Sequence, residues 1–241
     1  MSEPSAACFP FDILAFDADD TLWHNERLYA AAQERFRQLL GRYHEPAWID
    51  EHLYQTEVRN LAHFGYGIKA FALSMIETAL ELTEQRICGD EIQVILDIAR
   101  GMLEAEVELL DGVAATLAQL SGRCPLMLIT KGDLRDQEVK LARSGLDRYF
   151  KQVEIVSDKH RANYEAILRR HAVPAGRFLM VGNSLRSDIL PVLELGGSAV
   201  YIPYELTWTH EAADLPPEGQ PGFYRLERFD QLPGLLARLA D

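Results

Sequence analysis

The chain has 241 residues, of which 48% are hydrophobic and 25% charged, and 24 basic against 37 acidic side chains leave a formal net charge of −13. This composition excludes a disordered or fibrous protein and is sufficient for one large domain or a domain with a smaller satellite. The negative charge argues against non-specific binding to nucleic acid or anionic membranes, because long-range repulsion opposes both. A small anionic substrate remains compatible with it where local cations offset the field.

Cysteine usage and the terminus carry no special signal. Cys8, Cys88 and Cys124 are widely spaced, so a disulfide framework or a zinc site is not expected. The N-terminal residues lack a basic region followed by a long apolar run, which predicts no signal peptide. The apolar stretches are too short to span a membrane, so we expect a cytoplasmic protein.

The first half of the chain reads as one strand followed by helices. An apolar run at 11–16 ends abruptly at Asp17, as a buried parallel strand does. Helical periodicity follows over 25–42 and continues through 46–108, with a break at 63–67. No strand is expected between Leu22 and Leu120, so the helices form an insertion after the first strand.

The second half alternates between the two kinds of element. Apolar runs lie at 125–130, 152–156, 177–181, 198–202 and, more briefly, 222–226. Helical patterns lie at 134–144, 163–171, 187–195 and 231–240. Such alternation predicts an α/β fold with a parallel sheet covered by helices on both faces.

Polar side chains follow the apolar runs, where ligands bind in sheets of this kind. They are Asp17, Asp19 and Thr21 after the first run, Thr130, Lys131 and Gly132 at the second, Lys159 after the third, and Asn183 and Asp188 after the fourth. Asp17 and Asp19 are two residues apart, so we expect both carboxylates to face one pocket, which a cation or shared proton would have to stabilise. Capping of the next helix is the alternative for these acids.

Taken singly, each of the other residues has an ordinary explanation. Thr130 would be a strand-end hydroxyl, Lys159 a solvated surface lysine and Asp188 an acid near a helix start. Their common place after strands, with a cation among carboxylates, favours one functional site.

Four segments together resemble the motifs of the haloacid dehalogenase superfamily. FDADDTLW resembles motif I, LMLITKGD motif II, Lys159 the motif III lysine and VGNSLRSDIL motif IV, in family order over residues 11–190. The resemblance implies a Rossmann-like, doubly wound parallel-sheet core at 1–24 and 109–241, with an α-helical cap domain at 25–108. It also implies a hydrolase, and the second acid of motif I favours phosphatases over dehalogenases.

The resemblance implies hydrolysis of a phosphate monoester through an aspartyl-phosphate. Asp17 would attack phosphorus, and Asp19 would protonate the leaving oxygen and then activate water. Thr130 would hold the phosphoryl oxygens, while Lys159 would offset negative charge.

Magnesium is the implied cofactor. Its expected protein ligands are Asp17, the backbone carbonyl of Asp19, and the motif IV residues Asn183 and Asp188. Asn183 departs from the family pattern, which has an acid there. A neutral amide oxygen in that place predicts weaker binding of Mg²⁺.

The expected substrate is a small phosphorylated metabolite, such as a nucleoside monophosphate or a sugar phosphate. Candidate contacts are Thr21, Lys131, Gly132, Trp23 and Tyr66, although the aromatic residues could equally pack a core. Two alternatives stay open: a metal-independent dehalogenase-like hydrolase, which would tolerate Asp19→Asn, and a degenerate, non-catalytic protein that binds phosphometabolites. No chemical role is assigned to the aromatic segment 204–211.

Overall fold

The computed structural model describes residues 9–240, so Cys8 lies outside it. The described chain forms two compact units. One holds the residues up to His24, Val107–Lys131 and the chain from Gln137 onward, and the other holds Asn25–Glu106 with Gly132–Asp136. Within the described residues, no helix has the length and apolar character needed to cross a membrane.

The first unit contains a six-stranded, fully parallel sheet in the order β3-β2-β1-β4-β5-β6. Its strands are β1 Ile13–Phe16, β2 Leu126–Lys131, β3 Gln152–Val156, β4 Phe178–Gly182, β5 Ser198–Tyr201 and β6 Phe223–Arg225. All four residues of β1 are buried because the strand lies inside the sheet and both of its faces are covered. The predicted α/β, Rossmann-like sheet is confirmed.

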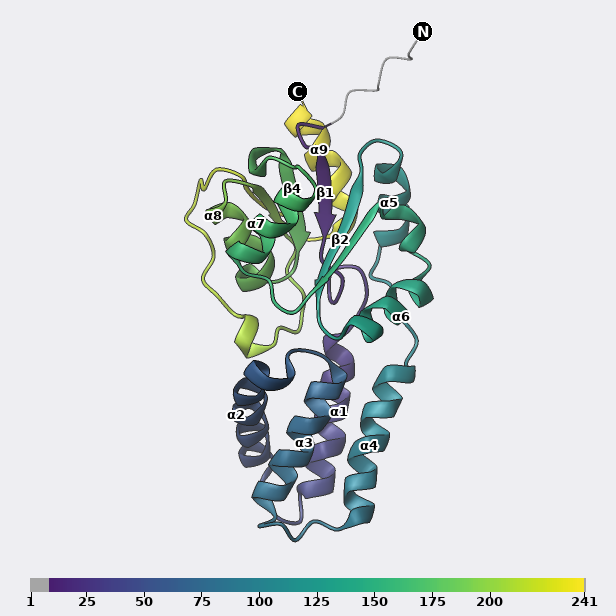
Figure 1. Ribbon diagram of the computed structural model, residues 1–241, viewed down its shortest axis with the longest axis vertical. Coiled ribbons are helices and arrows are strands. Elements are labelled where there is room, and N and C mark those ends of the chain that lie inside the picture. The colour runs from purple at the N-terminus through teal and green to yellow at the C-terminus, as the bar shows by residue number, and fades with distance from the viewer. Residues whose placement is uncertain (1–8, 241) are drawn as a thin grey trace. The chain divides into compact units, whose positions relative to one another are not determined.

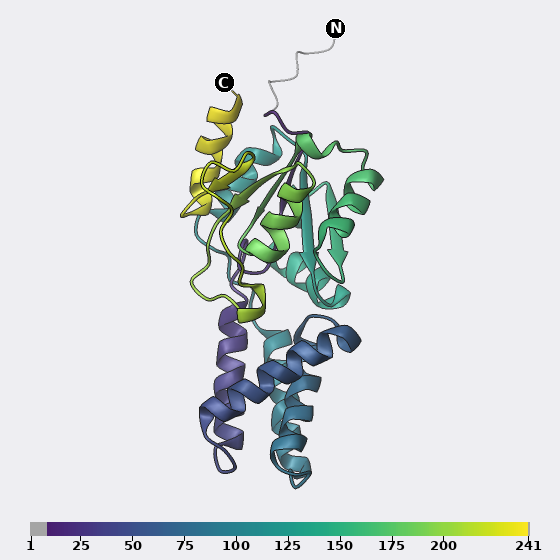
Figure 2. The ribbon, with the colours of Figure 1, turned by 90° about the vertical axis from the view of Figure 1, so that its left-hand side faces the viewer.

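Helices cover both faces of this sheet (Figures 1 and 2). They are α5 Val113–Ser121, α6 Leu134–Ser144, α7 Arg161–Arg170, α8 Leu190–Glu194 and α9 Leu232–Ala240. Alternate strand residues point to opposite faces. Leu14 and Phe16 therefore pack with α5 and α9, whereas Ile13 and Ala15 pack with α7 and α8.

The second unit is built on four helices. They are α1 Glu26–Leu40, α2 Pro46–Phe64, α3 Ile68–Leu82 and α4 Gly89–Glu104. Their apolar stripes meet in one core, which includes Phe36, Leu53, Phe71, Met75 and Ile98. Figure 1 shows the four helices lying side by side within this unit.

Two elements differ from the sequence predictions. Helix α5 was not expected, because nine residues give too short a window for its periodicity. The predicted helix at 187–195 is split into a π-helical turn, Leu185–Ile189, followed by the short α8. This turn carries Asp188, and π-turns are frequent at functional sites.

Candidate active site

The site lies where the order of the strands reverses. The chain runs from β1 outward through β2 to β3, and then returns to the other side of β1 for β4. Connections therefore diverge from the carboxyl ends of β1 and β4, which is where α/β sheets bind ligands. Asp17 stands at this point, since its backbone N–H donates to the carbonyl of Val181 at 2.9 Å.

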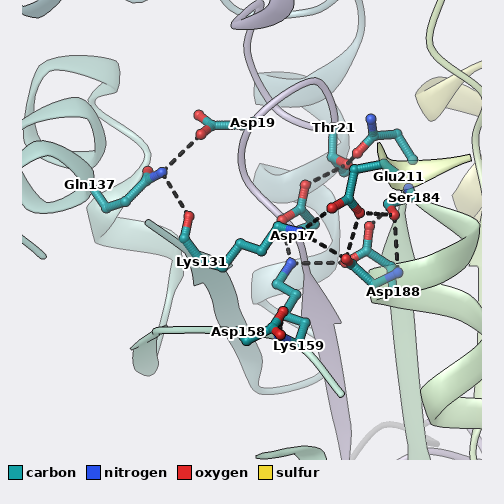
Figure 3. A network of polar contacts seen from close by, with 12 residues as sticks. Asp17, Asp19, Thr21, Lys131, Gln137, Asp158, Lys159, Ser184, Asp188 and Glu211 are labelled. Carbon is teal, nitrogen blue, oxygen red and sulfur yellow. Dashed lines mark hydrogen bonds and ion pairs between the residues drawn. The ribbon is translucent and has the colours of Figure 1, made fainter. Parts of the chain in front are cut away.

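The centre of the site is a buried group of two carboxylates and one ammonium (Figure 3). Nζ of Lys159 forms an ion pair with Oδ1 of Asp17 and another, at 2.8 Å, with Oδ1 of Asp188. Asp17 is 7% exposed, Lys159 3% and Asp188 1%. The three residues follow β1, β3 and β4, so only the folded sheet brings them together.

Backbone geometry fixes Asp188 in this group. Its Oδ2 accepts a hydrogen bond of 3.0 Å from the backbone N–H of Ser184. A Cβ atom at Gly182 would lie 2.3 Å from the same oxygen. Glycine is therefore required at the end of β4 for the carboxylate to approach the sheet this closely.

Burial and the neighbouring charges have opposing effects on the pKa values of Asp17 and Lys159. Burial raises the pKa of Asp17 from 3.8 to about 7, with Lys159 opposing the shift and Asp188 adding to it. Burial works against the charge on Lys159, but the attraction of Asp17 and Asp188 outweighs it and raises the lysine pKa above its ordinary value. The site therefore pairs a desolvated Asp17 carboxyl group, whose pKa lies near neutrality, with a Lys159 side chain that remains protonated.

Oxygen atoms of Asn183 and Thr21 complete this side of the site. Oγ1 of Thr21 lies 3.1 Å from Oδ2 of Asp17 and 3.1 Å from Oδ1 of Asn183. A hydroxyl has one proton, so it can donate to only one of the two oxygens at a time. This excess of oxygen acceptors fits a hard cation such as Mg²⁺. Within residues 9–240, however, no three acidic, histidine or cysteine side chains are grouped as metal ligands.

Asp19 has its own set of partners, away from Asp17 (Figure 3). Its carboxylate accepts from the indole N–H of Trp23 at 2.7 Å and from Nε2 of Gln137 at 2.8 Å. Nζ of Lys140 lies 3.1 and 3.2 Å from its two oxygens. The expectation that both motif I carboxylates point into one pocket is not met, because these three donors hold Asp19.

The remaining predicted residues occupy different places. Thr130 is buried near the end of β2. The ring of Trp23 is 1% exposed and lies in the hydrophobic core, and its indole N–H donates to Asp19. Gly132 and Tyr66 belong to the helical unit, Tyr66 on the turn between α2 and α3.

Glu211 is a site residue that sequence reasoning missed. It lies on the short 3-10 turn Thr209–Glu211, after β5. Its carboxylate forms an ion pair with Lys131 and accepts from the hydroxyls of Ser184 and Ser187. Burial opposes its charge, but these donors lower its pKa from 4.5 to about 2. Gln137 and Lys140 were also missed, although their spacing places both on one face of the predicted helix 134–144.

Comparison with known proteins gives the family. A family model for haloacid dehalogenase-like hydrolases matches residues 11–196. The structure of a haloacid dehalogenase-like family hydrolase from Xanthomonas campestris is 39% identical, with a TM-score of 0.86 over 96% of this chain and 93% of that one. The chain therefore belongs to the haloacid dehalogenase-like hydrolases and is a hydrolase of that superfamily. No curated protein matches the chain.

More distant structures share the fold, and they include a magnesium-bound hydrolase and a dehalogenase. A HAD-hydrolase from Bacillus subtilis bound to magnesium is 18% identical, with a TM-score of 0.67 over 94% of this chain and 99% of that one. A 2-haloacid dehalogenase from Pseudomonas syringae is 23% identical, with a TM-score of 0.64 over 95% and 99%. The fold alone therefore does not determine which reaction this chain catalyses.

Proposed function

We propose that this protein is a magnesium-dependent phosphatase that hydrolyses a small phosphorylated metabolite through an aspartyl-phosphate. The observation that carries the proposal is the pairing of a buried nucleophile with a second, separately held acid. Asp17 lies against Lys159 and Asp188, while Asp19, two residues along the chain, is held by its own donors. A dehalogenation that displaces halide needs the nucleophile but no acid to protonate a leaving oxygen.

The charges at the strand ends support the use of a metal ion. Lys131 forms an ion pair with Glu211, and Lys140 forms one with Asp19. Lys159 forms ion pairs with both Asp17 and Asp188. This set has one more carboxylate than ammonium groups, so it repels a phosphate dianion. A divalent cation would reverse that balance and make the approach of the substrate favourable.

The protein residues would act in two steps. An oxygen of Asp17 attacks phosphorus while the bond to the leaving oxygen breaks, and Asp19, after it has left Lys140 and taken up a proton from solvent, protonates that oxygen. Asp19 then takes a proton from water, which attacks phosphorus, releases phosphate and restores the Asp17 carboxylate. Lys159 and Thr130 offset and hold the charge on the phosphoryl oxygens.

The oxygen-rich side of the site would hold the metal. Its ligands would be Asp17, Asn183, Asp188 and the backbone carbonyl of Asp19. When bound, magnesium supplies positive charge next to the phosphoryl group. For Asp19 to reach the leaving oxygen, its carboxylate has to leave the hydrogen bonds from Trp23, Gln137 and Lys140.

A metal-independent, dehalogenase-like hydrolysis is the second candidate. It is favoured by Asn183, which puts a neutral amide where a third charged ligand would strengthen metal binding. The two candidates make different demands on Asp19, because only the phosphatase uses its carboxylate to move a proton.

One assay separates the candidates. Hydrolysis of an aryl phosphate is measured with Mg²⁺ and with EDTA, in the wild type and in Asp17→Asn and Asp19→Asn variants. We expect turnover only with Mg²⁺, none in Asp17→Asn, and a loss of about 100-fold or more in Asp19→Asn. Turnover in EDTA or in Asp17→Asn would refute the proposal. Release of halide from a 2-haloacid without metal would establish the second candidate, and a panel of phosphate monoesters would then identify the substrate of an active phosphatase.

A further inference from the structure

Glu211 links the segment after β5 to two loops of the active site. Its side chain is 14% exposed and accepts hydrogen bonds of 2.6 Å from Oγ of Ser184 and 2.5 Å from Oγ of Ser187. It also forms an ion pair with Nζ of Lys131, at the end of β2. The two serines lie in the loop that carries Asn183 and Asp188.

The hydroxyl groups of Ser184 and Ser187 both donate toward Glu211, so a hydrogen-bond acceptor is required at this position. Oγ of Ser184 accepts from the backbone N–H of Ser187 at 3.0 Å, so its own proton is directed to Glu211. Oγ of Ser187 accepts from Nζ of Lys131 at 2.9 Å, so it also donates to Glu211. Three donors therefore converge on this carboxylate. A glutamine would keep the shape, lose the charge and bring an NH₂ group to a place that needs only acceptors.

A second bond fixes the turn that carries Glu211. Nη1 of Arg186 donates to the backbone carbonyl of His210 at 2.7 Å. Two consecutive residues of the segment after β5 are therefore bound to the loop between Asn183 and Asp188. This arrangement gives the Glu211 carboxylate a defined place, although its segment contains little regular structure.

We propose that Glu211 is a positioning residue, which holds the Lys131 ammonium where it binds an oxygen of the anionic substrate group. The role of Lys131 in this inference rests on the proposed phosphatase function. A lysine side chain is flexible and its ammonium is a mobile point charge. Without Glu211, the other carboxylates of the same strand ends, Asp17 and Asp188, would attract the ammonium. It would then compete with substrate and cation for the nucleophile.

A double-mutant cycle tests whether Glu211 acts through Lys131. The proteins are the wild type, Lys131→Met, Glu211→Gln and the double variant. Glu218→Gln is the matched control, because Glu218 is an exposed glutamate of the same β5–β6 connection. The measurements are the dissociation constant for inorganic phosphate in the presence of Mg²⁺, by calorimetry, and kcat and KM for an aryl phosphate.

We expect each single variant to weaken phosphate binding and raise KM by about tenfold, the usual effect of losing one charge-assisted hydrogen bond. The double variant is expected to match Lys131→Met, and Glu218→Gln to match the wild type. If Glu211→Gln weakens binding as much in the Lys131→Met background as in the wild type, Glu211 does not act through Lys131 and the inference is refuted. Wild-type binding by Glu211→Gln refutes it as well.

Two further controls keep the outcomes distinct. If Glu211→Gln does not fold, Glu211→Asp keeps the charge on a shorter side chain, and its effect must likewise disappear in the Lys131→Met background. A wild-type protein that hydrolyses phosphate esters while the cycle shows no coupling refutes only the role of Glu211. A wild-type protein that neither binds phosphate nor hydrolyses its esters refutes the proposed function, and this inference with it.

Discussion

Replacing the nucleophile should make the protein more stable, in a way that depends on pH. The pKa of Asp17 is about 7 in the folded protein against an ordinary value of 3.8, because burial and Asp188 disfavour its charge. A group with a raised folded pKa contributes stability that is present below its unfolded pKa and is lost as the pH rises through the folded pKa. A shift of this size corresponds to about 4 kcal/mol.

We therefore expect Asp17→Asn to raise the free energy of unfolding by about 2 to 4 kcal/mol at pH 8, and by much less near pH 4. The assay is urea unfolding in EDTA at both pH values, followed by tryptophan fluorescence, since Trp23 is buried in the same unit. The same variant should have no activity. An equal gain at both pH values, or no gain at pH 8, would show that the buried charge of Asp17 is not the cause.

Three other changes test separate parts of the structure. Asn183→Asp should lower the Mg²⁺ concentration for half-maximal activity, and an unchanged value in a Mg²⁺ titration would remove Asn183 from the ligand set. Gly182→Ala should displace the Asp188 carboxylate and cost about 1 to 3 kcal/mol of stability with loss of turnover, so wild-type kcat would contradict the contact at 2.3 Å. In the helical unit, burial followed by repulsion from Glu26 raises the pKa of Glu57 from 4.5 to about 8, which predicts that stability falls as the pH rises between these values. Glu57→Gln should remove that fall and raise the melting temperature at pH 9 by roughly 5 to 10 °C, and equal melting curves for the two proteins at pH 9 would refute this.

The strand ends show why part of the site can be predicted from sequence. Asp17 directly follows a buried strand, and Asn183 follows another, so the local pattern places both at the same edge of a parallel sheet. The order of the four motifs along the chain adds the resemblance to the family. The spacing of the motifs does not predict where each side chain points. The Asp19 carboxylate is directed away from Asp17 because Trp23 and Gln137 donate hydrogen bonds to it.

The position of Glu211 in the site, by contrast, could not be predicted from the sequence. Its turn has no strand or long helix around it, and the nearby sequence consists of aromatic and polar residues without a period. Nothing in that pattern indicates that Ser184, Ser187 and Lys131 lie beside it. The contact depends on how the connection after β5 folds back over the strand ends, which is a long-range property of the chain.

Hydrophobic periodicity and strand-end residues are local features, so the sequence was enough to predict the parallel sheet, the helical insertion and the charged residues Asp17, Lys159 and Asp188. The tertiary structure alone decided which charges meet. It placed Lys159 between Asp17 and Asp188, Lys140 against Asp19, and Glu211 on Lys131. These pairings arise from segments far apart in the chain, brought together when the sheet and its connections pack. As a result, each of the three lysines of the site lies beside at least one carboxylate, although the chain as a whole is strongly acidic.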